Sequence, residues 1–150
     1  AEPTPVAWFW VGPSPAAPAS RVTARWRGGI ELTGVDGLPT TLAAGATIPL
    51  RMHWQSAAPL TEAYTAFAHL VGTDGALVAQ EDHAPRYGFW PTTGWRPGIA
   101  VDDAFTLTLP TTLPSGEYRL LTGWYAPATG ERLLMEDGAD AWELAQWSAP

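Results

Sequence analysis

The sequence contains no cysteine and no lysine. Without cysteine, the chain can form no disulfide and can use no thiolate as a nucleophile or a metal ligand. The 8 basic residues are all arginine, they stand against 15 acidic residues, and the net charge is −7. Because no basic stripe is available to bind phosphates, we expect no nucleic-acid partner.

Long apolar runs are missing as well. No segment approaches the roughly 18 consecutive apolar residues of a membrane-spanning helix, so we expect no membrane insertion by this chain. Apolar residues nevertheless make up 46% of the sequence, and charged residues only 15%. A chain of 150 residues with this composition can bury a hydrophobic core as one domain.

Residues 1–20 are rich in proline, which is typical of an extended leader or linker. Within them, residues 6–11 (VAWFWV) are continuously apolar and are a candidate for an added strand. Such a strand could join this domain or a neighbouring copy, and the second case would give self-association. Residues 21–150 form the predicted domain.

Short β-prone segments alternate with glycine- and proline-rich turns from residue 21 onward. Apolar side chains occupy every second position in two segments, which are Ile48, Leu50, Met52 and Trp54, and then Phe105, Leu107 and Leu109. This period is that of a strand with one buried face, and no stretch sustains the helical period of 3.6 residues. About eight such strands predict an all-β fold, an antiparallel β-sandwich of Ig-like or jelly-roll-like type.

Two turns have signatures of their own. Asp74-Gly75 is typical of a tight hairpin, because both residues tolerate positive φ. In the segment LPSGEYRL, a glycine turn precedes a strand that carries Tyr118. We expect the Tyr118 ring to fill the core while its hydroxyl bonds to backbone at the sheet corner.

The segment from Glu81 to Gly98 (EDHAPRYGFWPTTGWRPG) is too rich in proline and glycine for a helix and too irregular for a strand. A loop with this many rings predicts a ligand platform, since scaffolds often carry their sites on loops. The candidate ligand-binding residues are three rings and a polar rim: Tyr87, Trp90 and Trp95, with Arg86, Arg96 and Asp82. The alternative is a lid over the core, with Trp95 and Phe89 as buried plugs.

Acidic residues and histidines suggest further chemistry. Asp82, Asp102 and Asp103 are candidate ligands for a structural calcium ion, which takes oxygen donors, but their spacing matches no calcium motif. His53 and His69 would form a metal site only if their strands became neighbours. The alternative for these aspartates is to cap loop backbone.

Catalysis would require two carboxylates beside a cleft, and a hydrolase could recruit Glu81, Asp82, Asp102 or Asp103. No nucleophile elbow, zinc-protease motif, phosphate loop or dinucleotide motif accompanies them. We therefore expect no enzymatic activity and no cofactor beyond the candidate calcium.

Three segments carry a resemblance: FAHLVGTDGALVAQED, PTTGWRPG and LPSGEYRLLTGWYAPATGERL. They resemble the extracytoplasmic β-sandwich module often found C-terminal to multi-pass family-39-like glycosyltransferase membrane proteins of Chloroflexi-type bacteria. The resemblance implies a secreted or cell-surface location and a non-catalytic accessory role. With the loop aromatics, it predicts a carbohydrate-binding module. The alternative is a structural or protein-interaction domain that packs on a cell-surface partner or self-assembles.

Overall fold

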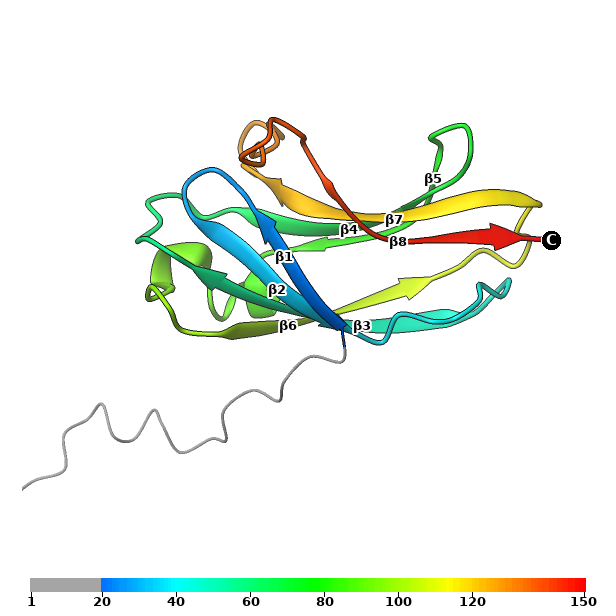
Figure 1. Cartoon of the computed structure of the whole chain (residues 1–150), viewed down its shortest axis with the longest axis horizontal. Helices are drawn as coiled ribbons and strands as arrows, with labels where there is room; N and C mark the ends of the chain where they lie inside the picture. The colour runs from blue at the N-terminus through cyan, green and yellow to red at the C-terminus, as the bar shows by residue number, and fades with distance from the viewer. Residues whose placement is uncertain (1–19) are drawn as a thin grey trace, which may run out of the picture.

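The structure is a computed structural model, and it describes residues 20–150. The candidate added strand at residues 6–11 lies outside the described residues. In the described part, eight strands form two antiparallel sheets that face each other (Figure 1). The predicted all-β sandwich is therefore confirmed.

The first sheet has the order β1-β2-β3-β6. Its strands are β1 (Ser20–Arg25), β2 (Ile30–Asp36), β3 (Thr47–Ser56) and β6 (Val101–Thr108). The second sheet has the order β5-β4-β7-β8. Its strands are β4 (Thr65–Val71), β5 (Leu77–His83), β7 (Gly116–Tyr125) and β8 (Trp142–Ala149). Two short turns, η1 (Pro85–Gly88) and η2 (Thr92–Gly94), lie between β5 and β6. Neither turn has the length and apolarity that a membrane-crossing helix requires, and residues 20–150 contain no other helix.

The alternating apolar residues face the space between the sheets. In β3, the side chains of Ile48, Leu50, Met52 and Trp54 are all buried. Leu50 lies opposite Phe105 of β6 in the antiparallel register, and Phe105 is buried too. Each strand thus contributes one face to a common core, as the period of two predicts.

Four tryptophans form a row through this core. Trp26 contacts Trp54 edge to face with a centroid separation of 5.6 Å, and Trp54 contacts Trp124 at 4.6 Å. Trp124 in turn contacts Trp95 at 5.6 Å. Edge-to-face packing is a favourable arrangement for aromatic rings. The row joins β3, β7 and the loop before β6 into one packed unit.

Both predicted turns are present, although of Asp74 and Gly75 only Gly75 adopts a positive φ. Gly75 has φ of +79°, and the Asp74 carboxylate accepts the Ala76 N–H at 2.9 Å. The Tyr118 ring is buried, and its hydroxyl donates to the carbonyl of Pro114.

The strands β5 and β6 are edge strands of different sheets, and they lie along the same side of the sandwich. The chain passes from one to the other through residues 84–100. This connection contains the aromatic loop, and it places that loop at one end of the sandwich (Figure 1).

Candidate functional site

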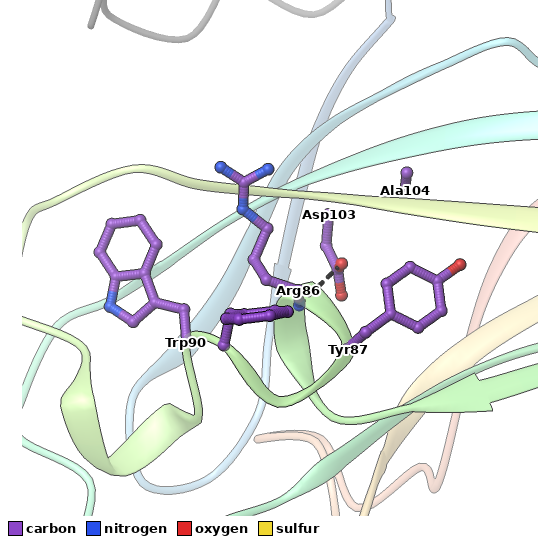
Figure 2. Close-up of a pocket in the computed structure, with 6 residues that line it drawn as sticks. Arg86, Tyr87, Trp90, Asp103 and Ala104 are labelled. Carbon is purple, nitrogen blue, oxygen red and sulfur yellow. Dashed lines mark hydrogen bonds between the residues drawn. The ribbon is translucent and has the colours of Figure 1, made fainter.

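An open pocket lies between the first half of this connection and β6. Its volume is about 390 Å³. Six residues line it: Arg86, Tyr87, Phe89, Trp90, Asp103 and Ala104 (Figure 2). We call it the loop pocket. Four of its residues come from the loop, and β6 supplies Asp103 and Ala104.

The backbone of the pocket wall is left-handed over three consecutive residues. Arg86 and Tyr87 have φ of +55° and +54°, and Gly88 follows at +91°. This conformation costs a residue with a side chain roughly 1–2 kcal/mol, and only glycine adopts it freely. Two such residues in succession must be held by their surroundings, and residues held in this way cluster at ligand-binding sites.

Several contacts hold the left-handed turn. The Arg86 N–H donates to the Asp103 carboxylate at 2.9 Å, and the Phe89 N–H donates to the Arg86 carbonyl at 3.1 Å. The Tyr87 ring stacks on His83 with a centroid separation of 4.0 Å. The hydroxyl of Tyr87 donates to Glu81 at 3.1 Å. Burial of the hydroxyl and the nearby Glu81 carboxylate raise the pKa of Tyr87, so it remains a proton donor at neutral pH.

The second half of the loop is anchored to the domain. The Thr92 side chain is fully buried, and its hydroxyl donates to the carbonyl of Glu62 at 2.6 Å. The same oxygen accepts the N–H of Tyr64 at 3.0 Å. Trp95 is only 4% exposed and completes the tryptophan row. These contacts fix the position from which the first half projects.

The aromatic rings of the first half differ from those of the second in exposure. Phe89 is 93% exposed and Tyr87 is 59% exposed, while Trp90 is half-buried. The expectation that Phe89 plugs the core is therefore wrong, because its backbone lies in the projecting turn. Trp95 fills the core, as the lid alternative predicted. Phe89 and Tyr87 thus leave apolar ring area in water beside the pocket, and contiguous apolar patches often mark interaction sites.

Asp103 supplies a buried carboxylate at the base of the pocket. It lies on the inward face of β6, and its side chain is 1% exposed. One oxygen, Oδ1, accepts the Arg86 N–H, and the other, Oδ2, has no hydrogen-bond partner among residues 20–150. Burial raises the pKa of Asp103 to about 6, although His83 and Arg86 oppose the shift.

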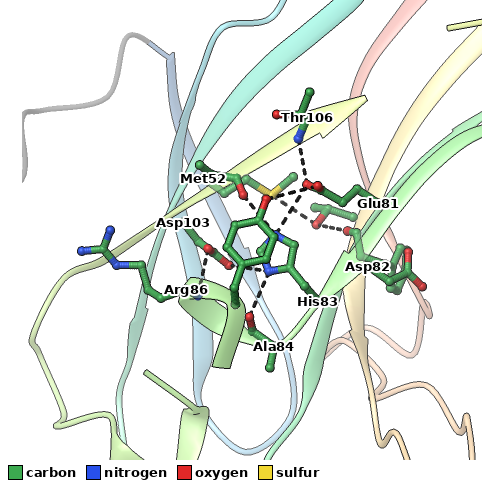
Figure 3. Close-up of polar contacts among 12 residues, drawn as sticks. Met52, Glu81, Asp82, His83, Ala84, Arg86, Asp103 and Thr106 are labelled. Atoms are coloured by element: carbon green, nitrogen blue, oxygen red, sulfur yellow. Dashed lines mark hydrogen bonds and ion pairs between the residues drawn. The ribbon is translucent and has the colours of Figure 1, made fainter. Parts of the chain in front are cut away.

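Glu81 and His83 connect the edge of β5 to the edge of β6. The Glu81 carboxylate accepts the backbone N–H of Thr106 at 2.8 Å. The His83 ring reaches the backbone carbonyl of Ala104 through Nε2 at 3.0 Å. Figure 3 shows these side chains gathered with Asp103 between the two strands. Side chains thus bond to β6 backbone groups along this side of the sandwich.

The structure brings together three of the six predicted ligand-binding residues. Arg86, Tyr87 and Trp90 line the loop pocket, and the Arg86 side chain is 46% exposed. Trp95 is buried and offers no free face for stacking. Arg96 is exposed but does not line the pocket. Asp82 lies on the outer face of the second sheet, where it bonds to His69 at 2.8 Å and to the Tyr125 hydroxyl at 3.0 Å.

The candidate calcium ligands point in different directions. Asp82 bonds on the outer face of the second sheet, Asp103 faces inward, and Asp102 pairs with Arg51 on the outer face of the first sheet. The two histidines lie in different sheets as well, and each contacts an aspartate rather than the other histidine. In the described part of the chain, no three histidine or acidic side chains converge to hold a metal ion.

Three pocket residues, Phe89, Asp103 and Ala104, were not among the predicted ligand-binding residues. Phe89 is a core plug only in the lid alternative, and no sequence signal marks the left-handed backbone before it. Asp103 is a sequence candidate for calcium, for catalysis or for capping loop backbone, and a signal for its place in the pocket exists. It shares the parity of Phe105 and Leu107, which face inward, so the alternation alone places its carboxylate inside.

Comparisons with known proteins bear on the fold. The sequence matches no protein-family model and no curated protein. A β-glucuronidase from glycoside hydrolase family 2 is similar in structure, with a TM-score of 0.51 and 13% identity. The match covers 73% of this chain but only 10% of the enzyme. The C-terminal domain of Wzt gives a TM-score of 0.44 and 18% identity, over 88% of this chain and 77% of that domain. At such identities, the likeness to the enzyme shows a shared sandwich fold and nothing further.

Proposed function

We propose that this chain is a non-catalytic binding domain whose loop pocket takes a carbohydrate. The observation that carries the proposal is the Phe89 ring, which stands 93% exposed at the mouth of the pocket. A phenylalanine in this position contributes almost nothing to folding, because its ring is not removed from water. Its area is available only to a partner.

The pocket has the chemistry that a sugar ring requires. The faces of Phe89 and Tyr87 can stack on the C–H face of a pyranose, and Trp90 adds a third ring at the rim. The Arg86 guanidinium offers fixed N–H donors to hydroxyl groups, and among residues 20–150 its single ion pair is a long one, 3.7 Å to Asp102. Binding pockets typically combine apolar rings with a few oriented polar groups in this way.

The carboxylates support a role without catalysis. Asp103 is buried beneath the pocket, and Asp82 bonds to His69 and Tyr125 on another face. Asp102 is paired with Arg51, and Glu81 accepts the Thr106 N–H and the Tyr87 hydroxyl. A glycosidase needs two carboxylates that flank the scissile bond, and these four do not face one cleft.

Protein recognition is the second candidate function. Exposed aromatic residues and arginine are also enriched where proteins bind one another, and Phe89 could enter a pocket of a partner. The secreted or cell-surface location remains a prediction of the module resemblance.

Affinity electrophoresis on a panel of soluble polysaccharides tests the proposal. We expect the wild-type chain to be retarded by at least one gel, and Phe89→Ala to lose about fivefold in affinity, since one aromatic stacking contact contributes roughly 1 kcal/mol. Leu77→Ala is a matched control, because Leu77 is 49% exposed and does not line the pocket. It should bind like wild type.

Thermal unfolding of the same variants should be unchanged. Absence of retardation on every gel would overturn the proposal, and so would equal binding by Phe89→Ala and the wild type. The second candidate would be favoured if no polysaccharide bound and Phe89→Ala weakened the binding of a partner protein.

A further inference from the structure

His83 lies between two backbone carbonyls. Its Nδ1 is 2.9 Å from the carbonyl oxygen of Ala84, and its Nε2 is 3.0 Å from that of Ala104. A carbonyl oxygen can only accept a hydrogen bond, so each ring nitrogen must carry a hydrogen to bond there. A neutral imidazole has one N–H, and only the imidazolium has two.

We infer that His83 is held as a doubly protonated imidazolium and that it is the positioning residue of the loop pocket. The inference about its protonation stands on the hydrogen-bond geometry. The inference about ligand affinity rests in addition on the proposed function.

The groups around the ring favour a positive charge. Glu81 and Asp103 each place a carboxylate oxygen 3.6 Å from a ring nitrogen. The faces of Tyr87 and Phe105 lie on either side, with centroid separations of 4.0 and 4.2 Å and an interplanar angle of 23° in both pairs. Aromatic faces carry negative potential and attract cations. The side chain of His83 is only 8% exposed, so water can replace few of these contacts.

The positive charge of the nearest arginine, Arg86, does not offset the negative groups beside the His83 ring. Arg86 directs its backbone N–H to Asp103, while its guanidinium lies 3.7 Å from Asp102. Asp102 faces outward and also pairs with Arg51. Of the charged side chains on the elements packed against His83, the two that meet its ring nitrogens are therefore both negative.

One charged ring thereby contacts Tyr87, Asp103 and Ala104 of the pocket lining. It bonds to Ala84 at the entrance to η1 and to Ala104 in the pocket lining, and it supports the Tyr87 ring from below. It also lies beside Asp103, which holds the Arg86 N–H. Loss of one proton would place a nitrogen lone pair against a carbonyl oxygen at about 3 Å, where the two repel. The left-handed turn would then lose part of its support.

Protonation of Asp103 would weaken this arrangement. Burial raises the pKa of Asp103 to about 6, so its carboxyl carries a proton below that pH. A protonated Asp103 holds the Arg86 N–H and the His83 charge less strongly.

A ¹H–¹⁵N long-range correlation spectrum of the wild-type side chains tests the protonation. At pH 7 we expect both His83 nitrogens at imidazolium shifts, with the ring identified by contacts to Tyr87 and Phe105. A neutral tautomer for His83 at pH 7 would overturn the inference. This measurement needs no variant, so it does not depend on whether a substituted chain folds.

Hydrogen–deuterium exchange tests the positioning role without any ligand. In His83→Gln, we expect the amides of residues 84–90 to exchange at least about tenfold faster at pH 7, after correction for intrinsic rates. His69→Gln is the matched control, because His69 bonds to Asp82 on the outer face and should leave residues 84–90 unchanged. Equal exchange of residues 84–90 in His83→Gln and the wild type would overturn the role.

The two proposals fail separately. If any polysaccharide gel retards the chain, His83→Gln should weaken that retention about tenfold and His69→Gln should not. Retention by a wild type whose His83 is neutral would remove the imidazolium and leave carbohydrate binding intact. If His83 is an imidazolium and the amides of residues 84–90 are protected, but no gel retards the chain, the positioning role stands. The proposal of carbohydrate binding is then overturned.

Discussion

The two halves of the loop between β5 and β6 use aromatic residues for different purposes. In residues 91–98, Trp95 is buried in the tryptophan row and Thr92 bonds to the connection before β4. In residues 84–90, Tyr87 and Phe89 are exposed to solvent, Tyr87 within and Phe89 directly after a left-handed turn at residues 86–88. One aromatic-rich loop thus contains a half that packs into the core and a half whose rings are exposed. The difference teaches that ring content alone does not distinguish core from binding surface.

Backbone geometry separates the halves. The anchored half follows ordinary turns, since Pro91 and Trp95 flank η2 with extended backbone. In the projecting half, unfavourable φ values at Arg86 and Tyr87 are held by Asp103, His83 and Glu81. Among residues 20–150, Arg86 and Tyr87 are the only non-glycine residues with positive φ, and strained residues of this kind cluster at functional sites.

The largest effect should come from removal of the anchor. Trp95→Ala deletes a ring that is 4% exposed and in contact with Trp124, so we expect the free energy of unfolding to fall by about 3–5 kcal/mol. Chemical denaturation monitored by circular dichroism would measure it. A loss below about 1 kcal/mol would show that the anchored half packs less tightly in solution than the structure shows.

A smaller effect should come from Asp103→Asn. The Asp103 pKa rises from 3.8 to about 6 on folding, so the folded chain binds this proton more tightly, and the wild type loses stability as the pH rises through that interval. At about 1.4 kcal/mol for each pKa unit, reduced by residual solvent screening, the asparagine variant should gain on the order of 2 kcal/mol relative to wild type from pH 4 to pH 7. Denaturation series at several pH values would measure the difference.

Asp102→Asn is the control for this series, because Asp102 faces outward and pairs with arginines on the surface. Its difference from wild type should show no comparable rise between pH 4 and pH 7. Asp103→Asn could instead become less stable relative to the wild type as the pH rises. The fold would then stabilise the ionised carboxylate, and the direction of its pKa shift would be wrong.

The smallest effect should come from the strained backbone. Arg86 has φ of +55°, so Arg86→Gly should be more stable than Arg86→Ala by about 1 kcal/mol. Both variants lose the same long ion pair to Asp102, and the comparison therefore isolates the backbone. Equal melting temperatures for the two variants would mean that residue 86 does not adopt the left-handed conformation in solution.

The sequence predicts the scaffold well because its signals are local. Leu50 and Phe105 alternate with polar neighbours, Asp74-Gly75 defines a hairpin, and Tyr118 follows a glycine turn. Each of these patterns needs only adjacent residues to be interpreted, and each is confirmed.

The site is less predictable because it depends on contacts between distant segments. Arg86 and Tyr87 carry no glycine-like signal for positive φ, and they are held by Asp103, 17 residues from Arg86. The exposure of Phe89 follows from that turn and not from its own identity. Asp82 looks equivalent to Asp103 as a loop carboxylate, yet strand parity places the two on different faces. Which of them meets the pocket depends on the face of its own strand and on how the edges of the two sheets lie side by side.

The bonds from Glu81 and His83 to β6 have a consequence for solubility. An edge strand with unpaired N–H and carbonyl groups can pair with a strand of another molecule, and sheets that join in this way aggregate. Here the N–H of Thr106 and the carbonyl of Ala104 are already bonded to side chains of β5. A foreign strand would have to displace two charged side chains from a half-buried position before it could pair. The residues that shape the loop pocket therefore also keep this edge of the sheet from recruiting other molecules.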